Sequence, residues 1–250
     1  MSIKSGATSQ YKRVSELLEQ HFREEPFHTF YHEISPLNIS KYHGGTCTDL
    51  VNHFVQRLKE DGCCDQVDIH CAYIDKRPCH RIVKIQIKDQ IFFLDPGNAW
   101  PCVGLYPLLK ATEFQAYGHT FQTVIDENVM KVYRTYEQRY HMMDIPLAAQ
   151  SSEWVLEQIG KRFEKPEIYP FYQRLRLACI VGEVFLFIRD DILYFYGKSR
   201  EYKTVNIQSS MHLEEILETH FSLSYKNFGF SLKKWKDWLI EYEKRLGDIR

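Results

Sequence analysis

The sequence predicts an α+β protein, and three changes in its apolar pattern indicate this. Apolar side chains recur at helical spacing in residues 1–66, alternate in residues 67–150, and form short strands followed by helices in residues 151–250. No repeat, low-complexity tract or Pro/Gly-rich linker separates these parts. We therefore predict three parts with these boundaries, joined in one protein.

The first part contains two predicted helices. Residues 10–24 carry one apolar stripe. The second helix follows Gly44 and Gly45, and Gly62 occupies the place of a C-terminal cap.

The middle and last parts are mainly predicted strands. From Val67 the pattern VDIHCAYID, HRIVKIQIKDQIFFLD and HTFQTVIDENVMKVYRTY indicates antiparallel strands joined by polar turns. A helix is expected near 154–163, followed by a four-strand meander through residue 207. Two helices are expected to close the chain, near 213–221 and 235–246.

Composition limits the partners. A hydrophobic content of 44% in 250 residues is enough for a core. The 32 basic and 33 acidic residues nearly cancel, so no net charge favours binding to nucleic acid or to an anionic membrane.

The sequence shows no signal peptide and no membrane span. The N-terminus has no apolar signal segment, and Glu183 interrupts the most apolar stretch. With seven cysteines, an odd number, free thiols and a cytoplasmic location are expected.

Cys47 is the candidate nucleophile. Thr46 and Asp49 form a T-x-x-D capping pattern, which places Cys47 in the first turn of the second helix. The helix dipole there favours a thiolate, and unpaired backbone N–H groups can stabilise an oxyanion. We expect Gly44 and Gly45 to let a substrate approach the backbone. The alternative is a buried structural cysteine.

His80 and Asp95 are the candidate base and its orienting partner. If Lys88 and Asp89 form a two-residue hairpin loop, the residue numbers of each facing pair sum to 177, so Ile82 faces Asp95. Residues 80 and 82 share a face of the strand, which makes Asp95 a diagonal neighbour of His80 on that face. A three-residue loop puts them on opposite faces. Each residue also has a non-catalytic interpretation when it is considered alone. His80 is then a solvated histidine at the end of a strand, and Asp95 is a turn residue that begins Asp-Pro-Gly.

A metal site is the competing interpretation of the cysteines. Cys63, Cys64, Cys71 and Cys79 lie near His80 in sequence, but they include no C-x-x-C pair. We therefore expect no metal. No glycine-rich phosphate loop is present, so the sequence does not locate residues that bind a nucleotide cofactor.

These segments resemble the arylamine N-acetyltransferase family. Residues 43–52, HGGTCTDLVN, are similar to that family's R-G-G-aromatic-C-x-E-x-N segment. The CHR string at 79–81 and the FLDPG string at 93–97 resemble its histidine strand and D-x-G segment. The stretch EPFHTF at 25–30 is more distantly like its P-F-E-N-L motif.

The resemblance implies a fold, a reaction and partners. The fold is an N-terminal helical region, a central antiparallel β-barrel and a C-terminal α/β lid. The reaction is ping-pong transfer of an acetyl group from acetyl-CoA to a small-molecule amine. Cys47 corresponds to the nucleophile, His80 to its base and Asp95 to the orienting carboxylate.

Several positions depart from the family pattern. His43 replaces the arginine, Thr46 the aromatic residue and Asp49 the glutamate, while Ala99 stands at a frequent glycine. The triad positions are unchanged. The alternatives are an amide synthase of the same family, a cysteine hydrolase, a transglutaminase-like or deamidase-like enzyme, and a non-enzymatic binding module.

Overall fold

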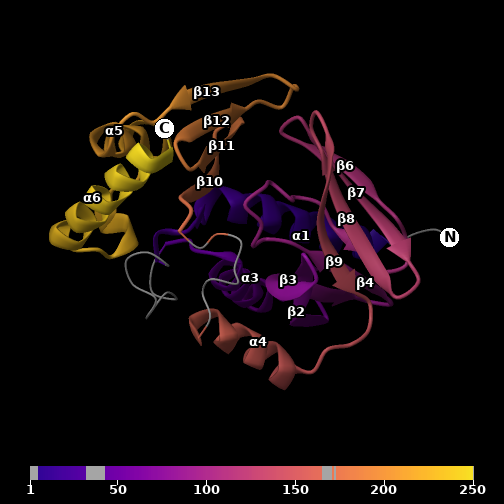
Figure 1. The fold of residues 1–250 in the computed structure, drawn as a ribbon. Coiled ribbons are helices and arrows are strands. Elements are labelled where there is room, and N and C mark those ends of the chain that lie inside the picture. The colour runs from indigo at the N-terminus through magenta and orange to yellow at the C-terminus, as the bar shows by residue number, and fades with distance from the viewer. Residues whose placement is uncertain (1–4, 32–42, 165–170, 172, 250) are drawn as a thin grey trace.

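Two antiparallel sheets and flanking helices make up the protein (Figure 1). The computed structural model describes residues 5–31, 43–164, 171 and 173–249. One sheet has eight strands and the other has five. This confirms the predicted α+β class.

The two N-terminal helices lie where the apolar spacing predicts them. Helix α1 spans Ser5–Glu24 and helix α3 spans Cys47–Asp61. The C-cap of α3 is Gly62, whose φ of 72° lies in the left-handed region that favours glycine. Its N–H donates to the carbonyl of Leu58 at 3.1 Å, which ends the helix as predicted.

The eight-stranded sheet curls into the predicted barrel-like wall (Figure 1). Its strand order is β5-β4-β3-β2-β9-β8-β7-β6. Its two halves are joined where Tyr73 of β2 pairs with Asp144 of β9. The strands are β2 (Gln66–Ile74), β3 (Arg77–Ile87), β4 (Gln90–Leu94), β5 (Tyr106–Pro107), β6 (Glu113–Ala116), β7 (His119–Asp126), β8 (Val129–Thr135) and β9 (Arg139–Pro146).

The five-stranded sheet carries the predicted C-terminal meander. Its order is β1-β10-β11-β12-β13. Strand β1 comes from the N-terminal part of the chain and pairs antiparallel with β10. In this pairing Phe27 lies opposite Ala178. The strands are β1 (Phe27–His28), β10 (Arg176–Val181), β11 (Val184–Arg189), β12 (Ile192–Tyr196) and β13 (Tyr202–Asn206).

The remaining helices cover the sheets. Helix α4 (Ser152–Glu164) lies beneath β2 and β3. Helix α5 (Ser210–Phe221), the short 3-10 helix η3 (Tyr225–Phe228) and helix α6 (Leu232–Ile249) pack with the five-stranded sheet. Among the described residues, no helix is both long and apolar enough to cross a bilayer.

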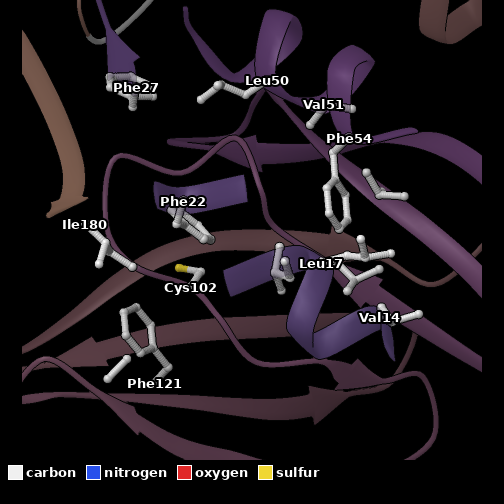
Figure 2. Close-up of a cluster of buried hydrophobic side chains, with 14 of the residues drawn as sticks. Val14, Leu17, Phe22, Phe27, Leu50, Val51, Phe54, Cys102, Phe121 and Ile180 are labelled. Carbon is white, nitrogen blue, oxygen red and sulfur yellow. The ribbon is translucent and has the colours of Figure 1, made fainter. Parts of the chain in front are cut away.

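A shared core joins α1 and α3 to both sheets (Figure 2). Leu17 of α1 and Phe54 of α3 are almost fully buried. Phe121 of β7 and Ile180 of β10 join the cluster from the two sheets, and Cys102 lies beside them in Figure 2. Burying such side chains stabilises the fold by about 1.5–3 kcal/mol each. The core thereby fixes α3, which begins at Cys47, against both sheets.

Candidate functional site

Cys47 is the first residue of α3, as the capping pattern predicts. Thr46 is the N-cap, and its backbone N–H and hydroxyl both donate to Asp49 Oδ2, at 2.9 and 3.0 Å. Cys47 itself is 6% exposed. The cap therefore fixes a buried thiol at the positive end of a helix.

The paired glycines before Cys47 meet a structural requirement of the chain. A Cβ at Gly44 would lie 2.2 Å from the carbonyl oxygen of Pro26, and one at Gly45 would lie 2.6 Å from the Asp49 side chain. Their φ angles of 72° and 143° also disfavour other residues. Protein atoms thus occupy the space that a side chain would need at either position, so only glycine fits the chain just before Cys47.

Glu25 holds this turn from the side. Its Oε2 accepts the Gly44 N–H at 2.8 Å and lies 3.5 Å from Nδ1 of His53. Burial raises the pKa of Glu25, but the bonds from His53 and Gly44 outweigh it and lower the pKa to about 2. His43 Nδ1 lies 3.9 Å from the same oxygen. Glu25 is therefore ionised at neutral pH and anchors the segment before the cysteine.

The predicted hairpin register brings His80 and Asp95 together. Val83 faces Leu94 and Ile87 faces Gln90 across β3 and β4, so facing positions sum to 177. The two-residue loop at 88–89 is therefore confirmed. His80 Nε2–H donates to Asp95 Oδ1 at 2.8 Å, and both side chains are buried.

Asp95 is held by a second bond that sequence reasoning missed. The Asn98 side-chain amide donates to Asp95 Oδ2 at 2.6 Å. Asp95 is 0% exposed, so both carboxylate oxygens have protein donors in place of water. These two bonds fix the carboxylate and, through it, the orientation of the His80 ring.

The Cys47 thiol donates to the Cys79 carbonyl at 3.9 Å, and the His80 imidazole lies close enough to lower the pKa of this thiol. Because Nε2 of His80 is bonded to Asp95, Nδ1 is the ring nitrogen left for the sulfur. Burial raises the pKa of Cys47, but His80 and Arg81 outweigh it and lower the pKa below its ordinary value. Burial lowers the pKa of His80, but Asp95 and Cys47 outweigh it and raise the pKa. Both directions favour a thiolate–imidazolium pair.

Arg81 adds a buried positive charge beside this pair. It is 1% exposed, and its Nη1 donates to the carbonyls of Pro78 at 2.8 Å and His80 at 3.1 Å. Within the described part of the chain it forms no ion pair. The charges of Cys47, His80, Asp95 and Arg81 then sum to zero when the thiol is ionised. A buried thiolate is thus stabilised without an uncompensated charge.

Arg81→Met is expected to slow alkylation of Cys47 at neutral pH by on the order of tenfold. The thiolate reacts with iodoacetamide, and the wild-type pKa is lowered, so wild-type alkylation persists below the ordinary thiol pKa of about 8.5. Removing the Arg81 cation raises the pKa of Cys47. The fall of the alkylation rate at low pH, the acid limb of the profile, therefore moves to higher pH. The measurement is the alkylation rate of Cys47 against pH, by mass spectrometry.

Arg77→Met is the matched control, because Arg77 begins the same strand but is exposed. Its acid limb is expected to coincide with that of the wild type. An unmoved limb in a folded Arg81→Met protein contradicts the role of Arg81.

A cavity of about 540 Å³ opens beside His80. It lies between the curled sheet and the five-stranded sheet, and most of its lining is aromatic or arginine. The principal lining residues outside the triad are Trp100, Arg134, Tyr136, Tyr140, Phe187, Tyr194 and Tyr196. A planar apolar ligand fits such a lining.

The cysteines of the metal alternative are free thiols. Cys63 and Cys64 have their sulfurs 3.9 Å apart, and His80 is bonded to Asp95. In the residues that the structure describes, no three His, Cys, Asp or Glu side chains gather as a metal site.

Sequence reasoning missed Asn98, Arg81 and Arg134. A signal was present for Arg81 and Arg134, since each is a cation within a strand whose neighbours are mostly apolar. Asn98 gave only a turn signal after Asp-Pro-Gly.

Solved arylamine N-acetyltransferases have the same fold. The enzyme of Salmonella typhimurium aligns with a TM-score of 0.73 at 14% identity, covering 96% of this chain and 100% of that chain. The enzyme of Mycobacterium marinum in complex with CoA aligns with a TM-score of 0.75 at 11% identity, covering 94% and 93%. That of Nocardia farcinica gives 0.70 at 14% identity, covering 92% and 88%.

No family model and no curated protein matches the sequence. The likeness therefore lies in the fold. The fold that the resemblance implied, including the curled sheet and the C-terminal α/β part, is confirmed.

Proposed function

We propose that this protein is an arylamine N-acetyltransferase-like enzyme that transfers an acetyl or similar acyl group from acyl-CoA to a small amine. The observation that carries the proposal is the buried Cys47–His80–Asp95 arrangement beside a cavity, within this fold. The CoA bound to the Mycobacterium marinum enzyme supports CoA as the carrier of the donor.

In the first half-reaction, the Cys47 thiolate attacks the carbonyl carbon of the acyl thioester. The carbonyl oxygen becomes negative, and N–H groups in the first turn of α3 stabilise it. The C–S bond to CoA then breaks. The leaving thiolate takes the proton from the His80 imidazolium, which leaves an acyl group on Cys47.

In the second half-reaction, the amine nitrogen attacks the acyl carbon on Cys47. His80, now neutral, accepts a proton from that nitrogen through Nδ1. The C–S bond to Cys47 breaks, which restores the thiolate–imidazolium pair and releases the amide. Asp95 keeps Nε2 protonated throughout and stabilises the imidazolium.

Intact-protein mass spectrometry after incubation with acetyl-CoA tests the donor and the nucleophile. The wild type is expected to gain one acetyl group and Cys47→Ser none, because a serine hydroxyl lacks the thiol's acidity. Cys102→Ser is the control, since this buried thiol belongs to the core and has a raised pKa. No gain by a folded wild type contradicts acetyl-CoA as the donor.

A further inference from the structure

Arg134 is a buried cation in the cavity wall, and none of the described residues is an acidic partner for it. It lies in β8 and is 9% exposed. Within the described residues it forms no ion pair, and its Nε has no hydrogen-bond partner. Burial lowers its pKa, yet a guanidinium remains charged at neutral pH. An unpaired buried charge is costly, so this site favours an anion.

Aromatic rings and a neutral histidine hold the guanidinium in place. Its carbon lies 3.8 Å from the ring centre of Trp100 and 5.2 Å from that of Tyr140. Nη1 donates to His119 Nδ1 at 3.1 Å. Burial and Arg134 together lower the pKa of His119 to about 3, so this ring adds no charge at neutral pH. The contacts orient Arg134 without neutralising it.

The rest of the lining leaves this positive charge uncompensated. Arg176 also lines the cavity, but it pairs with Asp190 at 2.7 Å. Arg189 is exposed to solvent. Glu137 is the one carboxylate among the described lining residues, and it is exposed. The buried part of the cavity is therefore apolar, aromatic and positive.

A short chain of contacts connects Arg134 to the candidate triad. Asn98 bonds Asp95 through its amide and accepts the Trp100 backbone N–H at 2.9 Å through its carbonyl. The Trp100 ring then stacks on Arg134. His80 and Arg134 also line the same cavity. One small ligand can therefore face both groups.

We propose that Arg134 binds the carboxylate of a small aromatic substrate and so selects an anionic acceptor. The planar fork of one guanidinium matches a carboxylate in two parallel hydrogen bonds, and the surrounding rings match a planar ligand. CoA phosphates carry several charges and suit exposed arginines better than one buried among aromatic rings. That the acceptor carries an amine rests on the proposed function.

Equilibrium binding of benzoate and its neutral isostere benzamide tests the carboxylate site. We expect the wild type to bind benzoate about tenfold or more tighter, because a charge-assisted bidentate contact forms only with the acid. In Arg134→Gln the preference is expected to fall to about one, and in Arg134→Lys to an intermediate value. Benzamide binding, retained in both variants, reports that the cavity is folded.

Arg139→Gln is the matched control. Arg139 also stacks on an aromatic ring, 3.7 Å from the centre of Tyr133, but it is exposed and outside the cavity. Its benzoate preference is expected to equal that of the wild type.

Equal wild-type affinities for benzoate and benzamide, or a preference that survives Arg134→Gln, overturn the proposal. So does a loss in Arg134→Gln that affects CoA but spares 3′-dephospho-CoA and benzoate, because Arg134 then binds a CoA phosphate. The assay needs no catalysis. A benzoate preference without acylation of Cys47 therefore contradicts the proposed reaction and leaves the carboxylate site standing.

Discussion

Asp95→Asn is expected to lower kcat for acetyl transfer by about 10³- to 10⁴-fold and to leave KM for the acyl donor within a few fold. An asparagine keeps the shape of the side chain but loses the charge that raises the pKa of His80. It can also present its amide to Nε2 and favour the wrong tautomer. Steady-state kinetics with the donor and an arylamine give both quantities.

Asp126→Asn is the matched carboxylate-to-amide control, because Asp126 is exposed and pairs with Lys131 at the surface. Its kinetics are expected to match the wild type. An equal loss in kcat and in donor binding for Asp95→Asn would instead indicate a structural role for Asp95.

Gly97→Ala is expected to lower kcat/KM by about 100-fold, because a displacement of about 1 Å can cost this much. A Cβ at Gly97 would lie 2.7 Å from Cys47 Cα and 2.8 Å from the Cys47 carbonyl oxygen. Either the start of α3 or the loop after Asp95 must move. Such overpacking also costs about 1–3 kcal/mol of stability. Kinetics and thermal unfolding measure the two effects.

Gly160→Ala is the control for the added methyl group. Gly160 lies within α4, and a Cβ there meets nothing within 4 Å. Wild-type activity is expected, with a gain of about 0.5–1 kcal/mol in stability. Wild-type activity in Gly97→Ala would show that the loop yields without moving Cys47.

Local sequence patterns predicted the parts of the site that depend on local geometry. The Thr46–Asp49 spacing predicts the start of α3, because a capping pattern acts within one turn. The two-residue loop predicts that His80 meets Asp95, because hairpin register follows from loop length.

Long-range contacts account for what the sequence did not predict. Strand β9 was missed because Arg139–His141 at its start are exposed and apolar side chains recur only afterwards. The short strand β1 forms only because β10, about 150 residues later, pairs with it. The cavity needs both sheets, so neither its aromatic lining nor the charge of Arg134 could be assigned to it from spacing alone.

The central claim is that Cys47 carries an acyl group from a thioester to an amine. Its most direct test is to isolate protein acetylated by acetyl-CoA and follow its mass with and without an arylamine. We expect the acetyl group to leave Cys47 rapidly only when the amine is present, with one acetylated amine formed per acetyl lost. Loss to water at the same rate without the amine, or a stable acetyl group that the amine does not remove, contradicts the account.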